Sequence, residues 1–215
     1  MNIKLISIVY LVLIIFSSCE NNQPSDFDYG KVKNNIYSNS FFNCEIKLPV
    51  NWTVLTSEQT EAMANRGKQL ISGDNQNMKA VIKASEINTA NLLSVFKYEV
   101  GAPVDYNPNL SMVAENIKDF PAIKNGKDYL FHVRKILNQS QLKYDYLDDD
   151  FREERIGGLD FYLMNTRLNY LGKTINQIYF STIIKKFTFN IIISFTDSKQ
   201  KDELMQTVNS IKFSL

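Results

Sequence analysis

The pattern of hydrophobic and polar positions is clearest in the last third of the chain. After the Lys185-Lys186 pair, large apolar residues fall on every second position at Phe187, Phe189, Ile191, Ile193 and Phe195. A period of two is typical of an antiparallel strand with one buried face. Two further strand-like runs precede it, over about residues 159–171 and 173–185, and join around Gly172. The pattern predicts three consecutive antiparallel strands.

Helices are predicted where polar capping residues precede apolar positions at helical spacing. Thr56 with Gln59, and Asp197 with Gln200, have the spacing of a capping box, in which each side chain bonds the other residue's backbone N–H. The first pair predicts a helix to about Ser72, with Gly67 inside it, and the second predicts the closing helix, followed by a short extended tail. A third helix is predicted over about 127–140 from its apolar stripe.

Between these elements the predictions rest on shorter patterns. Alternating residues predict a strand over about 40–48, which ends at Pro49. A hairpin is predicted from extended runs over 79–87 and 92–100, and a short helix from a cap at Ser111. A strand is predicted within 143–155, with an acidic bend at 148–150 and an end at the Gly157-Gly158 pair. Strands in hairpins with helices inserted in blocks indicate an α+β fold, as a single domain over 37–215.

The N-terminal residues have the layout of a bacterial lipoprotein signal. Lys4 is followed by an apolar run from Leu5 to Phe16, and then by Ser17, Ser18 and Cys19. The run is shorter than the roughly 20 residues of a membrane-spanning helix. Small residues before a cysteine resemble a lipobox, although Phe16 stands where leucine is usual. We therefore predict a signal peptide over 1–18 and lipidation of Cys19, which places the protein in the bacterial cell envelope, at the inner or outer membrane.

Residues 19–36 are predicted to form a flexible tether. The segment is polar, contains Pro24 and Gly30, and shows no apolar periodicity. No cluster of basic residues follows Cys19, so the lipid on Cys19 is expected to provide the contact with the membrane.

Composition and charge exclude several classes of function. The chain has 215 residues with 24 Lys and Arg against 23 Asp and Glu, a formal net charge of +1. The basic surface expected of a nucleic-acid binder is missing, so no nucleic acid partner is predicted. With 1 His and 2 Cys, and without a phosphate-binding, nucleophile-elbow or zinc-protease motif, the sequence predicts no cofactor, no metal and no catalytic residue.

Three features could in principle carry catalytic or metal-binding chemistry, but in each case the sequence favours a structural explanation. Cys44 falls on one face with Phe42, Ile46 and Leu48, which predicts a packed thiol rather than a nucleophile. The acidic segment Asp145–Glu154 lacks the spacing of a calcium loop and includes Arg152, so a solvated charged loop is favoured over a cation site. His132 has no visible carboxylate partner and is expected on a helix surface.

Several short motifs follow one another along the chain: Leu48-Pro49-Val50-Asn51-Trp52 after a strand, the Gly157-Gly158 pair, Gln177-Ile178-Tyr179-Phe180, and Ser210-Ile211-Lys212-Phe213 at the closing helix. Their order resembles that of the PsbP-type superfamily. The resemblance implies an α/β/α sandwich around a central antiparallel sheet. It also implies an adaptor-like role, since members of the superfamily include extrinsic subunits of membrane complexes and bacterial lipoproteins.

Tyrosines in the less regular middle of the chain are the candidate binding residues. Tyr98, Tyr106, Tyr144 and Tyr146 are predicted to form a partner surface, because tyrosine is enriched at interfaces. The leading hypothesis is a non-enzymatic lipoprotein that binds a protein partner at the envelope. The alternatives are a module that binds a small ligand or carbohydrate through the tyrosines, and a hydrolase with an unrecognised site. A pocket lined by Tyr98, Tyr106 and Tyr144 would favour the ligand-binding alternative.

Overall fold

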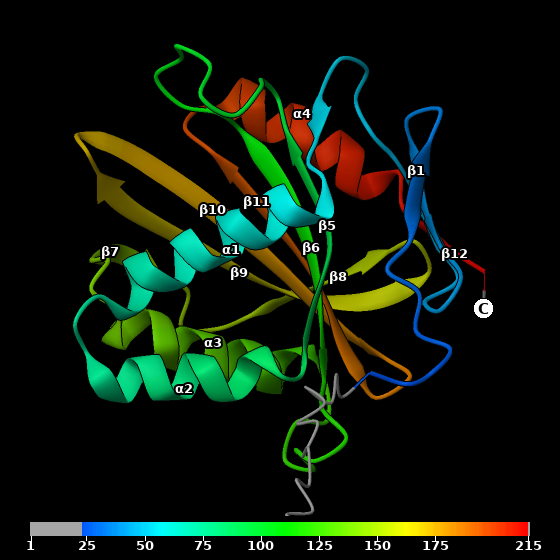
Figure 1. Ribbon diagram of the computed structural model, residues 1–215, viewed down its shortest axis with the longest axis horizontal. Helices are drawn as coiled ribbons and strands as arrows, with labels where there is room; N and C mark the ends of the chain where they lie inside the picture. The colour runs from blue at the N-terminus through cyan, green and yellow to red at the C-terminus, as the bar shows by residue number, and fades with distance from the viewer. Residues whose placement is uncertain (1–22, 215) are drawn as a thin grey trace, which may run out of the picture.

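The computed structural model describes residues 23–214 and has an α+β fold with four helices and two antiparallel sheets over that range (Figure 1). The predicted signal peptide and Cys19 lie outside these residues. In spatial order, the large sheet contains β4 (Thr53–Val54), β5 (Thr89–Phe96), β6 (Asn109–Asn116), β11 (Phe187–Phe195), β10 (Lys173–Ile184), β9 (Leu159–Tyr170) and β7 (Tyr144–Leu147), and β8 (Arg152–Ile156) also pairs with β9. The small sheet contains β1 (Lys31–Lys33), β2 (Ile36–Asn39), β3 (Cys44–Lys47) and β12 (Lys212–Phe213). The predicted α+β class is confirmed.

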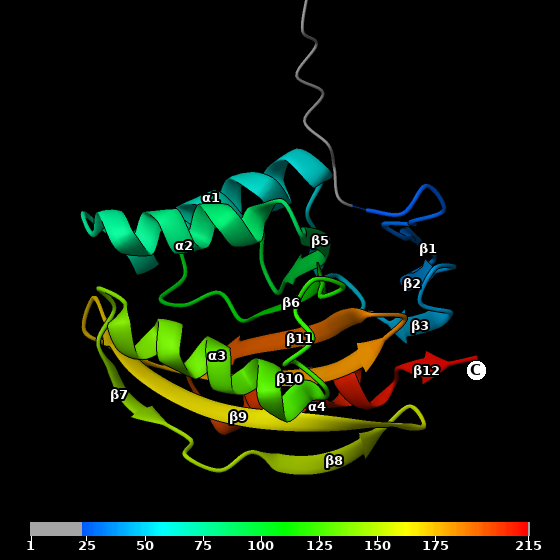
Figure 2. The ribbon, with the colours of Figure 1, turned by 90° about the horizontal axis from the view of Figure 1, so that it is seen from below.

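Helices cover both faces of the large sheet. On one face α4 (Ser198–Asn209) packs against β11 and β3, together with the small sheet. On the other face α3 (Gly126–Gln139) packs against β9 and β10, and α1 (Ser57–Ser72) crosses the sheet with α2 (Gln76–Glu86) alongside it. Figure 2 shows α1 and α2 as a layer of their own over the strands. The arrangement is the α/β/α sandwich that the resemblance implies.

The main core lies between the large sheet and α4. The five alternating residues of β11 all point into it, from Phe187 at 2% exposure to Phe195 at 7%. Burial of each such side chain contributes roughly 1.5–3 kcal/mol. Neighbouring strands add Phe180 and Phe161, and α4 adds Leu204 and Val208, all of them fully buried. The predicted strand and its apolar face are confirmed, but the prediction that β11 is only half-buried is wrong: Thr188, Asn190 and Ser194 on its other face are buried too, because β11 lies in the middle of the large sheet with helices over both faces.

Both predicted N-caps form, but only the first is a full capping box: Gln200 Oε1 accepts a hydrogen bond from the N–H of Thr196 at 2.8 Å and not from that of Asp197. The hydroxyl of Thr56 accepts a hydrogen bond from the N–H of Gln59 at 3.3 Å, and Gln59 Oε1 accepts one from the N–H of Thr56 at 3.0 Å. Asp197 caps α4 by accepting from the N–H of Gln200 at 2.9 Å. The caps satisfy backbone donors that the first turn leaves unpaired. As predicted, α1 begins at Ser57 and α4 begins at Ser198.

Two of the predicted elements are wrong. Of the residues predicted as a strand over 79–87, all but Ile87 belong to α2, which is capped by Asn75 and buries Met78. Residues predicted as a helix capped by Ser111 form β6, which pairs with β5 and β11. In β6 the buried positions Leu110, Met112 and Ala114 alternate with partly exposed ones, and this period of two defines a strand.

The predicted tether over 19–36 is also wrong where the structure describes it. Residues 31–33 and 36–39 pair as the β1–β2 hairpin. Before it, the ring of Phe27 packs against Phe41 and Phe187, with ring centres 4.9 and 5.3 Å apart. The carboxylate of Asp28 accepts hydrogen bonds from the N–H and hydroxyl of Ser40 at 2.8 and 2.7 Å. This segment is part of the folded domain.

Candidate functional site

A cavity of about 480 Å³ lies between α1 and the face of the large sheet that α1 crosses. Its lining comes from α1, from strands β5, β6, β9, β10 and β11, and from the residues around β7. Small-molecule sites commonly have volumes of roughly 300–1,000 Å³. The cavity therefore has the size of a small-ligand site.

The roof of the cavity is the apolar side of α1. Met63, Ala64, Gly67, Leu70 and Ile71 line it at helical spacing. An apolar helix face normally packs on a sheet, yet these residues stay partly exposed, with Leu70 at 38%. The buried residues of α1 are instead Thr60 and Ser72, near its two ends. The helix is thus held at its ends and spans the cavity in between.

The floor of the cavity is aromatic and hydrogen-bonding. The hydroxyls of Tyr179 and Tyr144 both donate to Oε1 of Gln177, at 3.2 and 3.5 Å. Further along, the hydroxyls of Tyr106 and Ser194 share a hydrogen bond. These contacts fix the positions of the tyrosine hydroxyls in the cavity lining.

The cavity lining carries no formal charge. Of the described residues, those that line it are apolar, aromatic, hydroxyl or amide side chains, together with Gly67. Burial raises the pKa of Tyr179 well above its usual value, and burial also raises the pKa of Tyr144 and Tyr106. The three phenols are therefore neutral at physiological pH. The site offers aromatic surface and neutral hydrogen-bonding groups, but no carboxylate, imidazole or thiol for acid–base or nucleophilic chemistry.

The structure places only two of the four predicted tyrosines together. Tyr106 and Tyr144 line the cavity, whereas Tyr98 and Tyr146 lie elsewhere on the surface, at 42% and 49% exposure. Tyr98 sits in the loop after β5, where its N–H donates to Asn107 Oδ1 at 2.9 Å. The hydroxyl of Tyr146 donates to Asp148 Oδ1 at 2.6 Å.

Sequence reasoning missed several residues of this site. Tyr170, Tyr179, Gln177 and Phe96 line the cavity beside the two predicted tyrosines. Gln177 and Tyr179 are two residues apart on β10, so the alternation along this strand already placed them on one face. The α1 stripe carried no comparable signal, because apolar residues at helical spacing usually mark a packed helix.

A second, larger hollow of about 1,030 Å³ adjoins the cavity. It lies between the β1–β2 hairpin, the start of α1 and the end of α2, and shares Thr60 and Asn91 with the cavity lining. Charged side chains line it, including Lys68 and Glu86, which form an ion pair at 2.8 Å. The hollow is a polar vestibule beside the neutral cavity.

Cys44, the acidic segment Asp145–Glu154 and His132 lie outside the cavity. Cys44 is 2% exposed, and burial raises its pKa to about 12. Asp148 accepts from the N–H and side-chain amide of Asn165 at 2.6 and 2.7 Å, while Arg134 pairs with Asp149 at 2.9 Å. His132 is exposed on α3. Over residues 23–214, no group of three or more acidic, histidine or cysteine side chains is close enough to hold a metal ion.

Among the residues described, no helix combines the length and apolar character needed to cross a membrane. No family model and no curated protein matches the sequence.

Solved structures resemble the chain at low identity. A PsbP from the cyanobacterium Synechocystis matches 86% of this chain and 98% of its own, at 13% identity and a TM-score of 0.49. LpqN of Mycobacterium tuberculosis, described as involved in cell envelope biogenesis, matches 79% of this chain and 82% of its own, at 11% identity and a TM-score of 0.45. A Bacteroides thetaiotaomicron protein matches 80% of this chain, at 11% identity and a TM-score of 0.43, and this chain spans 46% of its length.

Proposed function

We propose that this protein is a non-enzymatic binding module of the bacterial cell envelope that holds a neutral, partly apolar small molecule beneath α1. The observation that carries the proposal is the apolar stripe of α1 standing over a floor of neutral tyrosines. An apolar helix face left unpacked beside a cavity of ligand size favours an apolar occupant.

The lining defines the chemistry of the ligand. Aliphatic side chains of α1 suit a hydrocarbon or ring system, and the tyrosine rings of the floor suit stacking against a flat surface. Hydroxyl and amide groups such as Ser111 and Asn109 supply hydrogen bonds at the sheet side. A phosphate, a carboxylate or an ammonium group would be buried there without a counter-charge, which is strongly unfavourable. The expected ligand is therefore uncharged, with one apolar side and one edge of hydroxyl, ether or carbonyl oxygens.

Binding is tested with the purified full chain. An apolar fluorescent dye should bind with enhanced emission, and native mass spectrometry of protein isolated from its source should show a bound small molecule. The decisive variant is Gly67→Leu, because a Cβ added at Gly67 meets no atom within 4 Å and the leucine side chain enters the cavity. We expect dye affinity to fall at least tenfold.

A matched control separates cavity filling from a general effect on α1. Gln69 is exposed on the same helix and does not line the cavity, so Gln69→Leu should leave dye binding unchanged. If Gly67→Leu bound the dye as tightly as the unaltered chain, the cavity would not be the binding site.

The envelope location is proposed from the sequence around Cys19. The apolar run from Leu5 to Phe16, followed by Ser17, Ser18 and Cys19, supports signal cleavage and attachment of lipid to the Cys19 sulfur. Labelled palmitate should be incorporated into the native chain and not into Cys19→Ala, which should also be processed differently. Equal processing of both chains without label would refute the anchor.

An adaptor that binds a protein partner at the envelope is the second candidate. The exposure of Tyr98 and Tyr146 favours it, because exposed tyrosines are enriched at interfaces. Co-purification from membranes of a protein that is lost in a Tyr98→Ala and Tyr146→Ala double variant would support this role. Gly67→Leu should leave such a partner bound, so the two candidates are separable.

A further inference from the structure

The described chain starts at one end of the large sheet. The side-chain amide of Gln23 donates to the carbonyl oxygen of Asn88 at 3.2 Å, just before β5. The same carbonyl accepts from the N–H of Asn116 at 2.9 Å, at the end of β6. The N–H of Ile117 in turn donates to the carbonyl of Lys186, in the β10–β11 turn, at 3.0 Å. Gln23 is therefore held at the end of the sheet where β5 begins, β6 ends and β10 turns into β11.

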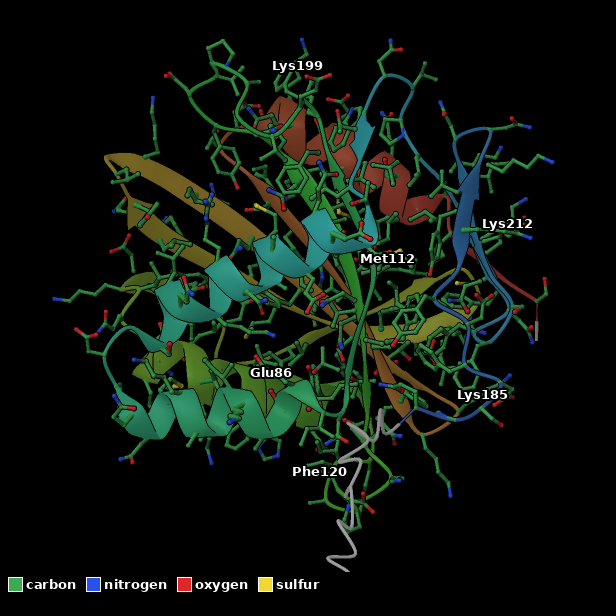
Figure 3. The ribbon with its side chains drawn as sticks, viewed as in Figure 1. Glu86, Met112, Phe120, Lys185, Lys199 and Lys212 are labelled. Carbon is green, nitrogen blue, oxygen red and sulfur yellow. The ribbon has the colours of Figure 1, made fainter. Side chains whose placement is uncertain are left out.

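Exposed apolar side chains gather at this end. Phe120 is 44% exposed in the loop after β6, and Ile87 is 55% exposed directly before Asn88. Two turns, with Phe120 N–H donating to Ile117 and Ile123 N–H donating to Phe120, form the loop around Phe120. Figure 3 shows Phe120 at the opposite end of the molecule from Lys199.

Basic side chains surround these apolar residues. Lys118 and Lys124 flank Phe120 in the loop, and Lys186 lies in the adjoining turn, all three exposed. Asp119 is the exposed acid in the same loop. Aromatic and aliphatic side chains with lysines around them suit a phospholipid surface, where the apolar groups enter the interface and the ammonium groups meet phosphates.

We propose that this end of the domain, made up of Ile87, Phe120, Lys118, Lys124 and Lys186, rests on the phospholipid bilayer. The inference rests on the lipid anchor proposed at Cys19. Three residues lie between Cys19 and Gln23, and the four steps from one Cα to the next span at most about 14 Å when extended. Since Gln23 is fixed beside Asn88, an anchored Cys19 brings this end of the sheet, and not another surface, to the headgroups. The short reach favours a bilayer over a protein partner as the occupant.

The β9–β10 turn provides the internal reference. It lies at the other end of β10 from the Lys185-Lys186 turn, and the 12 residues of β10 separate the two turns by roughly 40 Å. Leu171 in the β9–β10 turn is 85% exposed. A protein resting on its Phe120 end holds Leu171 in water.

The test places one fluorescent label on each end of the full, lipidated chain in vesicles of phosphatidylethanolamine and phosphatidylglycerol. Phe120→Cys and Leu171→Cys are labelled with an environment-sensitive dye, and Cys44 is buried and stays unlabelled. Brominated acyl chains should quench the label at 120 at least twofold and shift its emission to shorter wavelength. The label at 171 should be unaffected. Ile87→Cys is a second variant at the docking end and should behave like Phe120→Cys.

The possible failures are distinguishable. If palmitate is incorporated and the chain stays on the vesicles, yet labels at 120 and 87 are no more quenched than at 171, the docking proposal is wrong and the anchor stands. If no palmitate is incorporated and the chain stays in solution, the anchor is wrong and the docking proposal falls with it. A label at 120 that is shielded in cell membranes but unquenched by brominated lipid would indicate a protein over this end, which also overturns the proposal.

Discussion

The hydroxyl of Tyr129, on α3, donates a hydrogen bond to Oε2 of Glu115, on β6, at 2.9 Å. The pair lies beneath the first turn of α3, which approaches the sheet so closely that a Cβ at Gly126 would lie 2.0 Å from the carbonyl oxygen of Ser181. Burial raises the pKa of Glu115, and the hydrogen bond from Tyr129 offsets only part of this. A partly buried carboxyl is thus tolerated under α3 although no lysine or arginine of residues 23–214 forms an ion pair with it.

We expect Glu115→Gln to stabilise the protein at pH 7, because glutamine removes the cost of holding a charge at this partly buried position. The folded carboxyl has a raised pKa, so the folded state binds its proton more tightly than the unfolded state, and stability falls as pH rises from the unfolded value of 4.5 through the folded pKa. Glutamine keeps an oxygen acceptor for Tyr129 and carries no charge. Urea unfolding at a series of pH values measures the difference.

The two stabilities should converge as pH falls below 4.5, where the glutamate is protonated in both the folded and the unfolded state. Glu99→Gln, at an exposed position, provides the control and should leave the unfolding free energy unchanged. A Glu115→Gln variant less stable than the unaltered chain at pH 7 would show that the charge of Glu115 is favourable where it lies.

Glu203 shows the opposite behaviour. Burial acts to raise its pKa, but hydrogen bonds from Lys97 and from the indole N–H of Trp52, at 3.1 Å, lower it overall. The stabilisation is present above pH 4.5 and is lost as pH falls through the lowered pKa. Glu203→Gln should therefore destabilise the protein by about 1 kcal/mol at pH 7 and by less at pH 3.

Trp52 reports this change directly, because it is the one tryptophan of the sequence. Its emission should shift in Glu203→Gln and stay the same in Asp202→Asn, an exposed neighbour on α4. An unchanged unfolding midpoint in Glu203→Gln at pH 7 would contradict the assigned contact.

Local chemistry explains which parts of the fold were predictable. The caps by Thr56 on Gln59 and by Asp197 on Gln200 bond only within one helical turn, so their sequence spacing already contains this part of the structure. By contrast, the run over 79–87 contains alanines that fit a strand or a helix, and the Asn75 cap decides between them. Ser111 has the residue type of a helix cap, but pairing with β5 and β11 overrides that preference.

The candidate site was predictable only in part for a related reason. Tyr106 and Tyr144 were identified by residue type, and type alone placed Tyr98 and Tyr146 with them although they lie apart. The cavity is present because α1 is buried near Thr60 and Ser72, while the residues between them do not pack tightly against the sheet. Such spacing between two layers depends on the loops that hold them and leaves no periodic signal along the chain.

The thiol of Cys44 should be unreactive in the folded protein. Burial raises its pKa to about 12, so at pH 8 about one molecule in ten thousand carries the reactive thiolate. Labelling by a thiol reagent should therefore proceed only as fast as the domain opens, and should become complete within minutes in strong denaturant. Rapid native labelling that Cys44→Ser abolishes would show that the thiol is accessible.

Phe27 is expected to contribute to stability although it lies in a segment whose composition predicts a tether. Its ring packs against Phe41, Phe42 and Phe187, with centres 4.9 to 5.9 Å away. Phe27→Ala leaves a void beside these rings and should lower the unfolding free energy by about 2 kcal/mol, less than for a fully buried ring because Phe27 is partly exposed. Asp26→Ala, at the exposed neighbouring position, should have no effect in the same urea titration. If the segment were a free tether, both variants would have the same unfolding midpoint. If it is folded, only Phe27→Ala should lower the midpoint, and this is the result that the contact of Gln23 with Asn88 implies.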